Sequence, residues 1–79
     1  MNWEEAKDLK IGDLVKYRNE HWGEELIYVV SAHKSSKSQN FDWIETKLVA
    51  IIEDPYGEEA SGRYNVIFKI NSIYWEQIA

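Results

Sequence analysis

Cysteine is absent from the sequence, which excludes both a disulfide framework and a thiolate zinc site. Proline occurs once, and the four glycines are scattered, so there is no glycine-rich loop of the kind that cradles phosphate. No apolar run exceeds five residues, far short of a segment that spans a bilayer. The first residues, Met1–Glu5, lack the basic and apolar regions of a signal peptide, so the expected location is cytoplasmic.

Positive charge is also scarce. Nine basic residues face 14 acidic ones, and the formal net charge is −5. This balance argues against a broad basic field that would attract nucleic acid, although it is too small to indicate a DNA mimic.

The sequence offers little for catalysis. The two histidines, His21 and His33, lie 12 residues apart in segments of loop character, a spacing that matches no metal site. Carboxylates are plentiful but fall in turns and on polar faces, where their pKa values stay ordinary and they make poor general acids. We therefore expect a protein that is not an enzyme and that binds no metal or cofactor.

Aromatic bulk is what the chain has in abundance, with four Trp, five Tyr and two Phe in 79 residues. Rings bury a large area at little cost in side-chain entropy, which suits a domain with few core positions. A chain of this length forms one domain, so residues 1–79 are predicted to be a single small β-barrel.

The segment Trp43–Glu53 is the predicted centre of that barrel. Its first part alternates between apolar and charged residues, and its second part, Leu48–Ile52, is apolar throughout. This pattern predicts a long, bent strand that ends covered on both faces. The whole set of predicted strands is Leu14–Arg18, Leu26–Ala32, Phe41–Asp54, Arg63–Ile70 and Ile73–Ile78. Five short strands separated by turn signals predict an all-β fold, and closure into a barrel would remove exposed sheet edges.

Two further details follow from these patterns. In the fourth predicted strand, Tyr64, Val66, Phe68 and Ile70 share one apolar face, to which Ile67 is the exception. Residues 33–40, HKSSKSQN, contain no apolar side chain and predict a mobile hairpin loop.

The N-terminal segment, residues 2–8, predicts a short helical turn. Asn2 can accept a hydrogen bond from the first free amides, and Glu5 stands where its capping-box partner belongs. Trp3, Ala6 and Leu9 could form a stripe that closes one end of the barrel, with a partner-binding helix as the alternative.

The phrase Leu9–Tyr17, LKIGDLVKY, resembles the opening of Src-homology-3-like small barrels, including KOW-type and CarD-type domains. Gly12 in this phrase suits a backbone position with positive φ. The closing segment, Ile73–Ile78, is similar to the short turn and last strand of such barrels. The Ala-Leu-Tyr-Asp-Tyr phrase of eukaryotic signalling barrels and the basic turn of nucleic-acid-binding KOW domains are both absent. Short length, acidity and Trp content resemble small phage-encoded accessory proteins.

The leading candidate site is a protein-binding surface made of loop aromatics and carboxylates. Trp22 lies among charges, and Tyr56 occupies a second acidic loop, so the two rings could flank one acidic groove. The carboxylates assigned to this surface are Glu20, Glu24, Glu25 and Glu58. The alternative for each ring is structural: Trp22 would fold back over a barrel end, and Tyr56 would cap a solvated turn.

Two other functions compete with protein binding. A nucleic-acid-associated barrel would use Lys16, Arg18, Lys34 and Lys37. A homo-oligomeric structural protein would pair Tyr74 or Trp75 across subunits, because neighbours on a strand point opposite ways and one of these rings should be partly exposed. The sequence does not name a partner.

Overall fold

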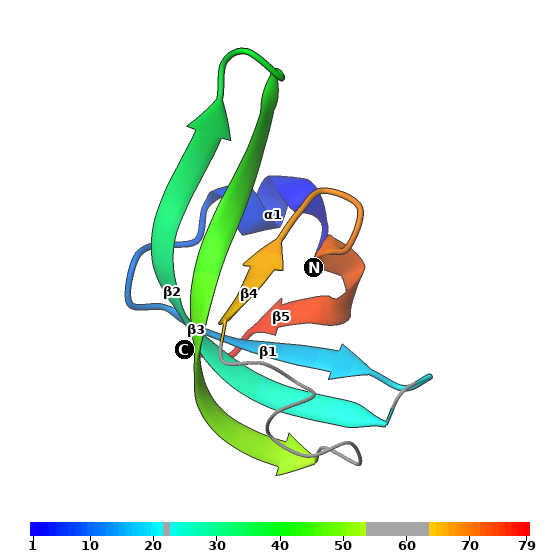
Figure 1. Ribbon diagram of the computed structural model, residues 1–79. Coiled ribbons are helices and arrows are strands. Elements are labelled where there is room, and N and C mark those ends of the chain that lie inside the picture. The colour runs from blue at the N-terminus through cyan, green and yellow to red at the C-terminus, as the bar shows by residue number, and fades with distance from the viewer. Residues whose placement is uncertain (22, 54–63) are drawn as a thin grey trace.

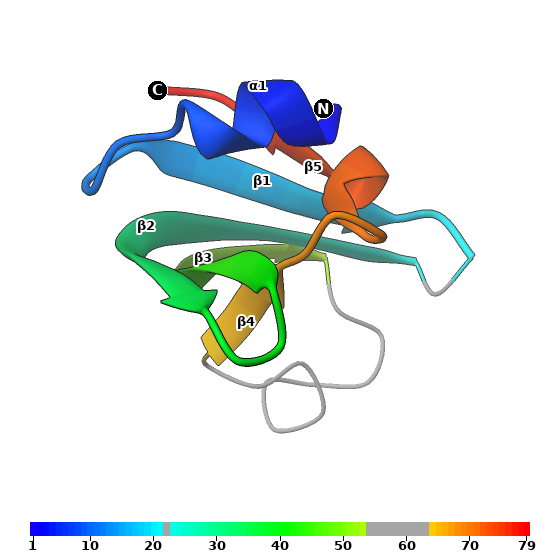
Figure 2. The ribbon, with the colours of Figure 1, turned by 90° about the horizontal axis from the view of Figure 1, so that it is seen from above.

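The computed structural model describes residues 1–21, 23–53 and 64–79. Its strands form one antiparallel sheet in the order β4-β3-β2-β1-β5. The elements are α1 (Trp3–Lys7), β1 (Leu14–Asn19), β2 (Glu24–Ser36), β3 (Phe41–Glu53), β4 (Tyr64–Ile67), the 3₁₀ turn η1 (Ser72–Tyr74) and β5 (Trp75–Gln77). The prediction of a five-stranded all-β fold is confirmed. The sheet curls (Figure 2), but the described residues show no pairing between its edge strands β4 and β5.

A long hairpin of β2 and β3 is the element to which the other strands are added (Figure 1). β1 pairs with only the first part of β2, residues 24–29, so the far end of the hairpin extends past it. The pairing of β2 with β3 slips at three places, which leaves Ser31 as an extra residue on β2 and Val49 and Ile52 as extra residues on β3. Such bulges bend a strand and increase its twist, which lets one hairpin serve both halves of a curled sheet.

The core lies on the inner side of the sheet beneath α1, and its largest fully buried side chains are Trp75 and Tyr28. Their ring centroids are 5.2 Å apart, and Tyr17 contacts Trp75 at 5.1 Å. Figures 1 and 2 both place α1 beside β5 and η1. The Met1 amino group donates hydrogen bonds to the carbonyl oxygens of Ser72 and Trp75, which ties the helix to the last strand.

The predicted N-terminal cap and the predicted glycine turn are both present. The Asn2 side chain accepts from the Glu5 amide, and the Glu5 side chain accepts from the Asn2 amide, which completes a capping box. Ala6 and Leu9 are buried in the core, and Trp3 packs against it, as the predicted stripe required. Gly12 has a φ of 99°, and its amide donates to the Val30 carbonyl, which sets where β1 begins.

The prediction that Leu48–Ile52 is covered on both faces is wrong. Leu48 packs against the core, but Val49, Ala50, Ile51 and Ile52 are exposed. Bulges at Val49 and Ile52 break the alternation of the strand, and β4 pairs only with residues 44–47 of β3. No described strand therefore borders the outer edge of this segment.

The fourth strand is shorter than predicted, and its apolar alternation does not identify the residue that enters the core. β4 ends at Ile67, which is 0% exposed, whereas Phe68 is 37% exposed and Ile70 is 88% exposed. Ile67 pairs with the buried Ile44, so the residue that broke the apparent pattern is the one that faces the core. Asn71 then ends the strand, because its side chain accepts from the Phe68 amide and donates to the Val66 carbonyl.

Two segment boundaries differ from the prediction. β2 continues through Ser36 and pairs residue by residue with the start of β3, so the predicted loop at 33–40 is reduced to a turn at residues 37–40. Asn40 supplies the positive φ of that turn, at 55°. The last predicted strand, Ile73–Ile78, is divided between η1 and the shorter β5.

Candidate functional site

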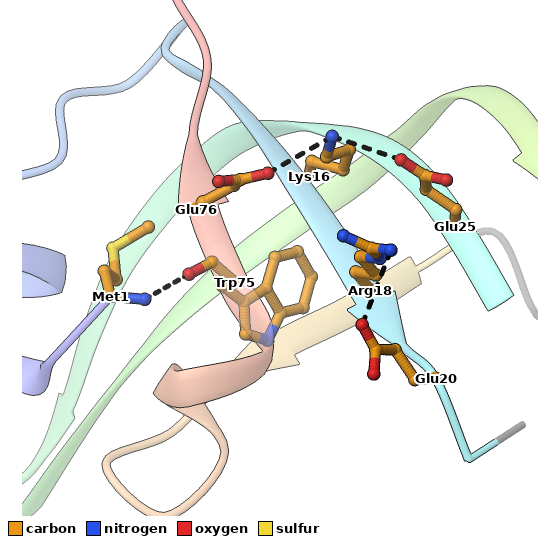
Figure 3. Close-up of polar contacts among 7 residues, drawn as sticks. All are labelled: Met1, Lys16, Arg18, Glu20, Glu25, Trp75 and Glu76. Atoms are coloured by element: carbon orange, nitrogen blue, oxygen red, sulfur yellow. Dashed lines mark hydrogen bonds and ion pairs between the residues drawn. The ribbon is translucent and has the colours of Figure 1, made fainter. Parts of the chain in front are cut away.

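A groove of about 430 Å³ lies where β1 ends beside η1. Arg18, Glu20 and His21 line one wall, and Ile73 and Tyr74 line the other. The buried Trp75 also lines the groove. Figure 3 shows Trp75 between Arg18 and Glu20 on one side and Met1 on the other. The two walls are more than 50 residues apart in sequence, and the pairing of β1 with β5 brings them together.

The wall from the β1–β2 turn is held by a buried asparagine. Asn19 accepts a hydrogen bond from the His21 amide at 3.1 Å and donates one to the Tyr17 hydroxyl at 3.2 Å. An asparagine that bonds its own backbone two residues onward fixes a turn. Arg18 and Glu20 then meet at 3.4 Å on the solvent side, where both remain available to a partner.

The opposite wall presents apolar surface to solvent. Ile73 is 72% exposed and Tyr74 is 42% exposed, whereas the next residue, Trp75, is 1% exposed. The Tyr74 ring lies 6.2 Å from that of Tyr17, measured between ring centroids. The buried Ser72 hydroxyl donates to the Lys69 carbonyl and anchors this turn from below. The groove therefore combines a fixed apolar wall with a charged one.

Beside the groove, Lys16 links three strands (Figure 3). Its amino group lies 3.1 Å from Glu25 on β2 and 3.2 Å from Glu76 on β5. The hydrogen bond to Glu25 and, as the second cause, the one to Glu76 hold the pKa of Lys16 above its ordinary value. Glu25 also stands opposite Glu53 on β3, a like-charge pair that would destabilise the sheet without a neighbouring cation.

The structure places the described residues of the predicted protein-binding surface in different settings. Glu20 lines the groove, whereas Glu25 is engaged by Lys16. Glu24 begins β2 opposite Asn19 and makes its own interactions. Trp22, Tyr56 and Glu58 lie outside the described residues, so their assignment stays a prediction.

Sequence reasoning did not include Ile73 and Tyr74 in the site. It did predict that one ring of the Tyr74–Trp75 pair is partly exposed, and Tyr74 is that ring. The buried position of Trp75 excludes it as a contact between subunits, whereas Tyr74 is still accessible for one. The signal that could have found this wall is an apolar pair, Ile73 and Tyr74, placed directly before a short last strand.

The four basic residues of the nucleic-acid hypothesis do not form one surface. Lys16 and Arg18 lie on β1 in ion pairs with carboxylates. Lys34 is near the far end of β2, and Lys37 is in the turn beyond it. About 20 Å of strand separates Lys34 from the part of β2 that pairs with Lys16.

Comparisons with known protein families, with curated proteins and with solved structures each return no match. Across the described ranges, no three His, Asp or Glu side chains gather as a metal site would require. No helix in those same ranges has the length and apolar character needed to cross a membrane. The chemistry of the surface is therefore the basis for assigning a function.

Proposed function

We propose that this chain is a small, non-enzymatic protein-binding module with a Src-homology-3-like fold. The strand order β4-β3-β2-β1-β5 and the 3₁₀ turn before the last strand support this fold, together with the opening phrase around Gly12. The partner binds in the groove between the β1–β2 turn and η1.

The observation that carries the proposal is the contrast between the two groove walls. Ile73 and Tyr74 expose apolar surface and line the same groove as the Arg18–Glu20 pair. Contiguous apolar surface with a polar rim is typical of interaction sites. Glu20 and Glu76 add exposed carboxylates at the rim. The groove therefore suits an extended segment with an apolar or aromatic side chain next to a lysine or arginine.

The proposal can be tested with a display library of random 12-residue peptides. We expect the selected peptides to place a basic residue beside an apolar one. Their affinity should fall about tenfold or more in an Ile73→Ser/Tyr74→Ser variant, because interface anchors of this kind carry more than about 1 kcal/mol each.

Ile11→Ser is the matched control, since Ile11 is also an exposed aliphatic residue but does not line the groove. Equal binding by the wild type and the Ile73→Ser/Tyr74→Ser variant would reject the groove. Trp22→Ala and Tyr56→Ala belong in the same assay, where a loss of affinity would extend the site to the two predicted rings.

A further inference from the structure

The far end of the β2–β3 hairpin carries a second exposed surface, which we call the hairpin surface: Phe41, Trp43, Phe68 and Ile70. Phe41 and Trp43 are in contact, with ring centroids 5.3 Å apart. Phe41, Phe68 and Ile70 line a cavity of about 320 Å³, and all three are exposed. Three of the four members are aromatic, so this is a platform of rings rather than a scatter of single apolar residues.

Three lysines lie close to this platform. Lys34 is directly opposite Trp43 across the β2–β3 pairing, Lys37 lies in the adjoining turn, and Lys69 lines the cavity. Among the described residues, none of these three forms an ion pair. The contrast is with Lys16 and Arg18 at the other end of the sheet, where carboxylates engage both cations.

The acidic character of the chain does not cancel this local charge. Glu25, at the acidic end of β2, is about 30 Å of strand away from Lys34, whereas charges in physiological salt are screened over about 8 Å. Asp42 and Glu45 are the carboxylates on the nearby part of β3, and Glu45 accepts a hydrogen bond from the Trp43 indole at 3.3 Å. Among the described residues of the hairpin, its turn and the segment after β4, three lysines near this surface thus stand beside two carboxylates.

We propose that the hairpin surface binds single-stranded nucleic acid. Unpaired bases would stack on Phe41, Phe68 and the accessible part of Trp43, and Lys34, Lys37 and Lys69 would contact phosphates. Stacking requires bases that are free of a partner strand, so a duplex fits this surface poorly.

An anionic membrane shares part of this chemistry but fits the shape less well. The turn at the end of the hairpin, residues 37–40, reads Lys-Ser-Gln-Asn, so the part that extends furthest has no apolar side chain to insert. Phe41, Phe68 and Ile70 instead line a hollow beside the turn, together with Asp42 and Lys69, and this hollow can receive a flat base.

The test uses fluorescence polarisation with labelled 12-nucleotide oligo-dT and oligo-U at 50 and 200 mM salt. With three phosphate contacts, log K should fall with log salt at a slope of roughly −2, or about 16-fold over this range. Phe41→Ala and Phe68→Ala should each weaken binding by about fivefold or more, because stacking contributes about 1–3 kcal/mol per base. Both side chains are exposed, and circular dichroism confirms that the variants fold.

Charge position is tested with two single variants of equal net charge. Lys34→Glu should weaken binding, whereas Lys10→Glu should retain most of it, because Lys10 is exposed and does not line the cavity that Lys34 and Trp43 share. No binding at 50 mM salt, or equal losses in the two variants, would overturn the proposal. So would equally tight binding of a 12-base-pair duplex. Vesicles with 30% phosphatidylserine should leave the protein free, and capture by vesicles without oligonucleotide binding would assign the surface to lipid instead.

This proposal does not rest on the groove, because the two surfaces share no residue, although the segment after β4 contributes Ile70 to one and Ile73 to the other. Ile73→Ser/Tyr74→Ser should therefore leave oligonucleotide binding unchanged, and Phe41→Ala should leave peptide binding unchanged.

Discussion

Both ends of the β2–β3 hairpin carry aromatic rings and lysines, but these side chains contribute to the fold at one end and are exposed at the other. Where β1 and β5 join the sheet, the rings of Tyr28 and Trp75 pack at a tilt inside the core and Lys16 is held between two carboxylates. At the far end, Phe41 and Phe68 are exposed, and Lys34 has no carboxylate partner among the described residues.

The difference lies in how many neighbours each part of β2 has. Residues 24–29 have β1 on one side and β3 on the other, and β5 and α1 complete the enclosure. Residues 32–36 pair only with β3, on whose other side the short β4 is the described strand. A ring or a lysine is therefore structural at one end and available to a partner at the other.

The largest effect is expected from removing the central ring of the enclosed end. Trp75→Ala should lose about 3–5 kcal/mol of unfolding free energy, which is most of the stability of a domain this small. Trp43→Ala is the matched control, because Trp43 is only half-buried at the hairpin end, and it should lose about 1–2 kcal/mol. Urea unfolding followed by circular dichroism measures both, and equal losses would break the comparison.

A smaller loss of unfolding free energy is expected from removing a side-chain hydroxyl that links β3 to β4. The buried Thr46 donates to the Asn65 carbonyl at 2.8 Å. Thr46→Val keeps the shape and removes the donor, so it should cost about 1–2 kcal/mol. The half-buried Ser31 makes a similar bond to the Glu45 carbonyl at 3.0 Å, and Ser31→Ala should cost less than about 1 kcal/mol. The reverse order in urea unfolding would contradict the burial assigned to this edge.

The smallest effect is expected from pH, through Lys16. Because Glu25 and Glu76 raise its pKa in the folded state, the stability it contributes is fully present below the ordinary lysine pKa of about 10.4. That contribution is lost as pH rises through the higher folded-state pKa. The wild type should therefore exceed Lys16→Met in unfolding free energy at pH 7 and at pH 9.5, and the gap should narrow at pH 11.5. The control is Lys10→Met, which removes an exposed lysine without a described ion pair, and a matching change there would assign the effect to other groups.

Local signals in the sequence were reliable. The capping box of Asn2 and Glu5 and the positive φ at Gly12 each depend on a few neighbouring residues. Five strands could be counted because turn residues separate apolar runs.

Features set by pairing between distant residues were not predicted. One bulge residue is enough to exchange the two faces of a strand, and nothing in the apolar run Leu48–Ile52 marks Val49 and Ile52 as bulges. The groove could not be foreseen for the same reason, since its walls meet only through the pairing of β1 with β5. Trp22 and Tyr56 were chosen as rings in acidic loops, whereas the described apolar wall comes from η1.

The orientation of β4 is the central claim on which the hairpin surface depends, and one pair of variants tests it. Ile67 is buried against the core while Phe68 faces outward, opposite to the face that alternation favours. In urea unfolding, Ile67→Ala should lose about 2–4 kcal/mol and Phe68→Ala less than about 1 kcal/mol. A larger loss for Phe68→Ala than for Ile67→Ala would mean that the apolar face of β4 is in the core, and the hairpin surface would not exist.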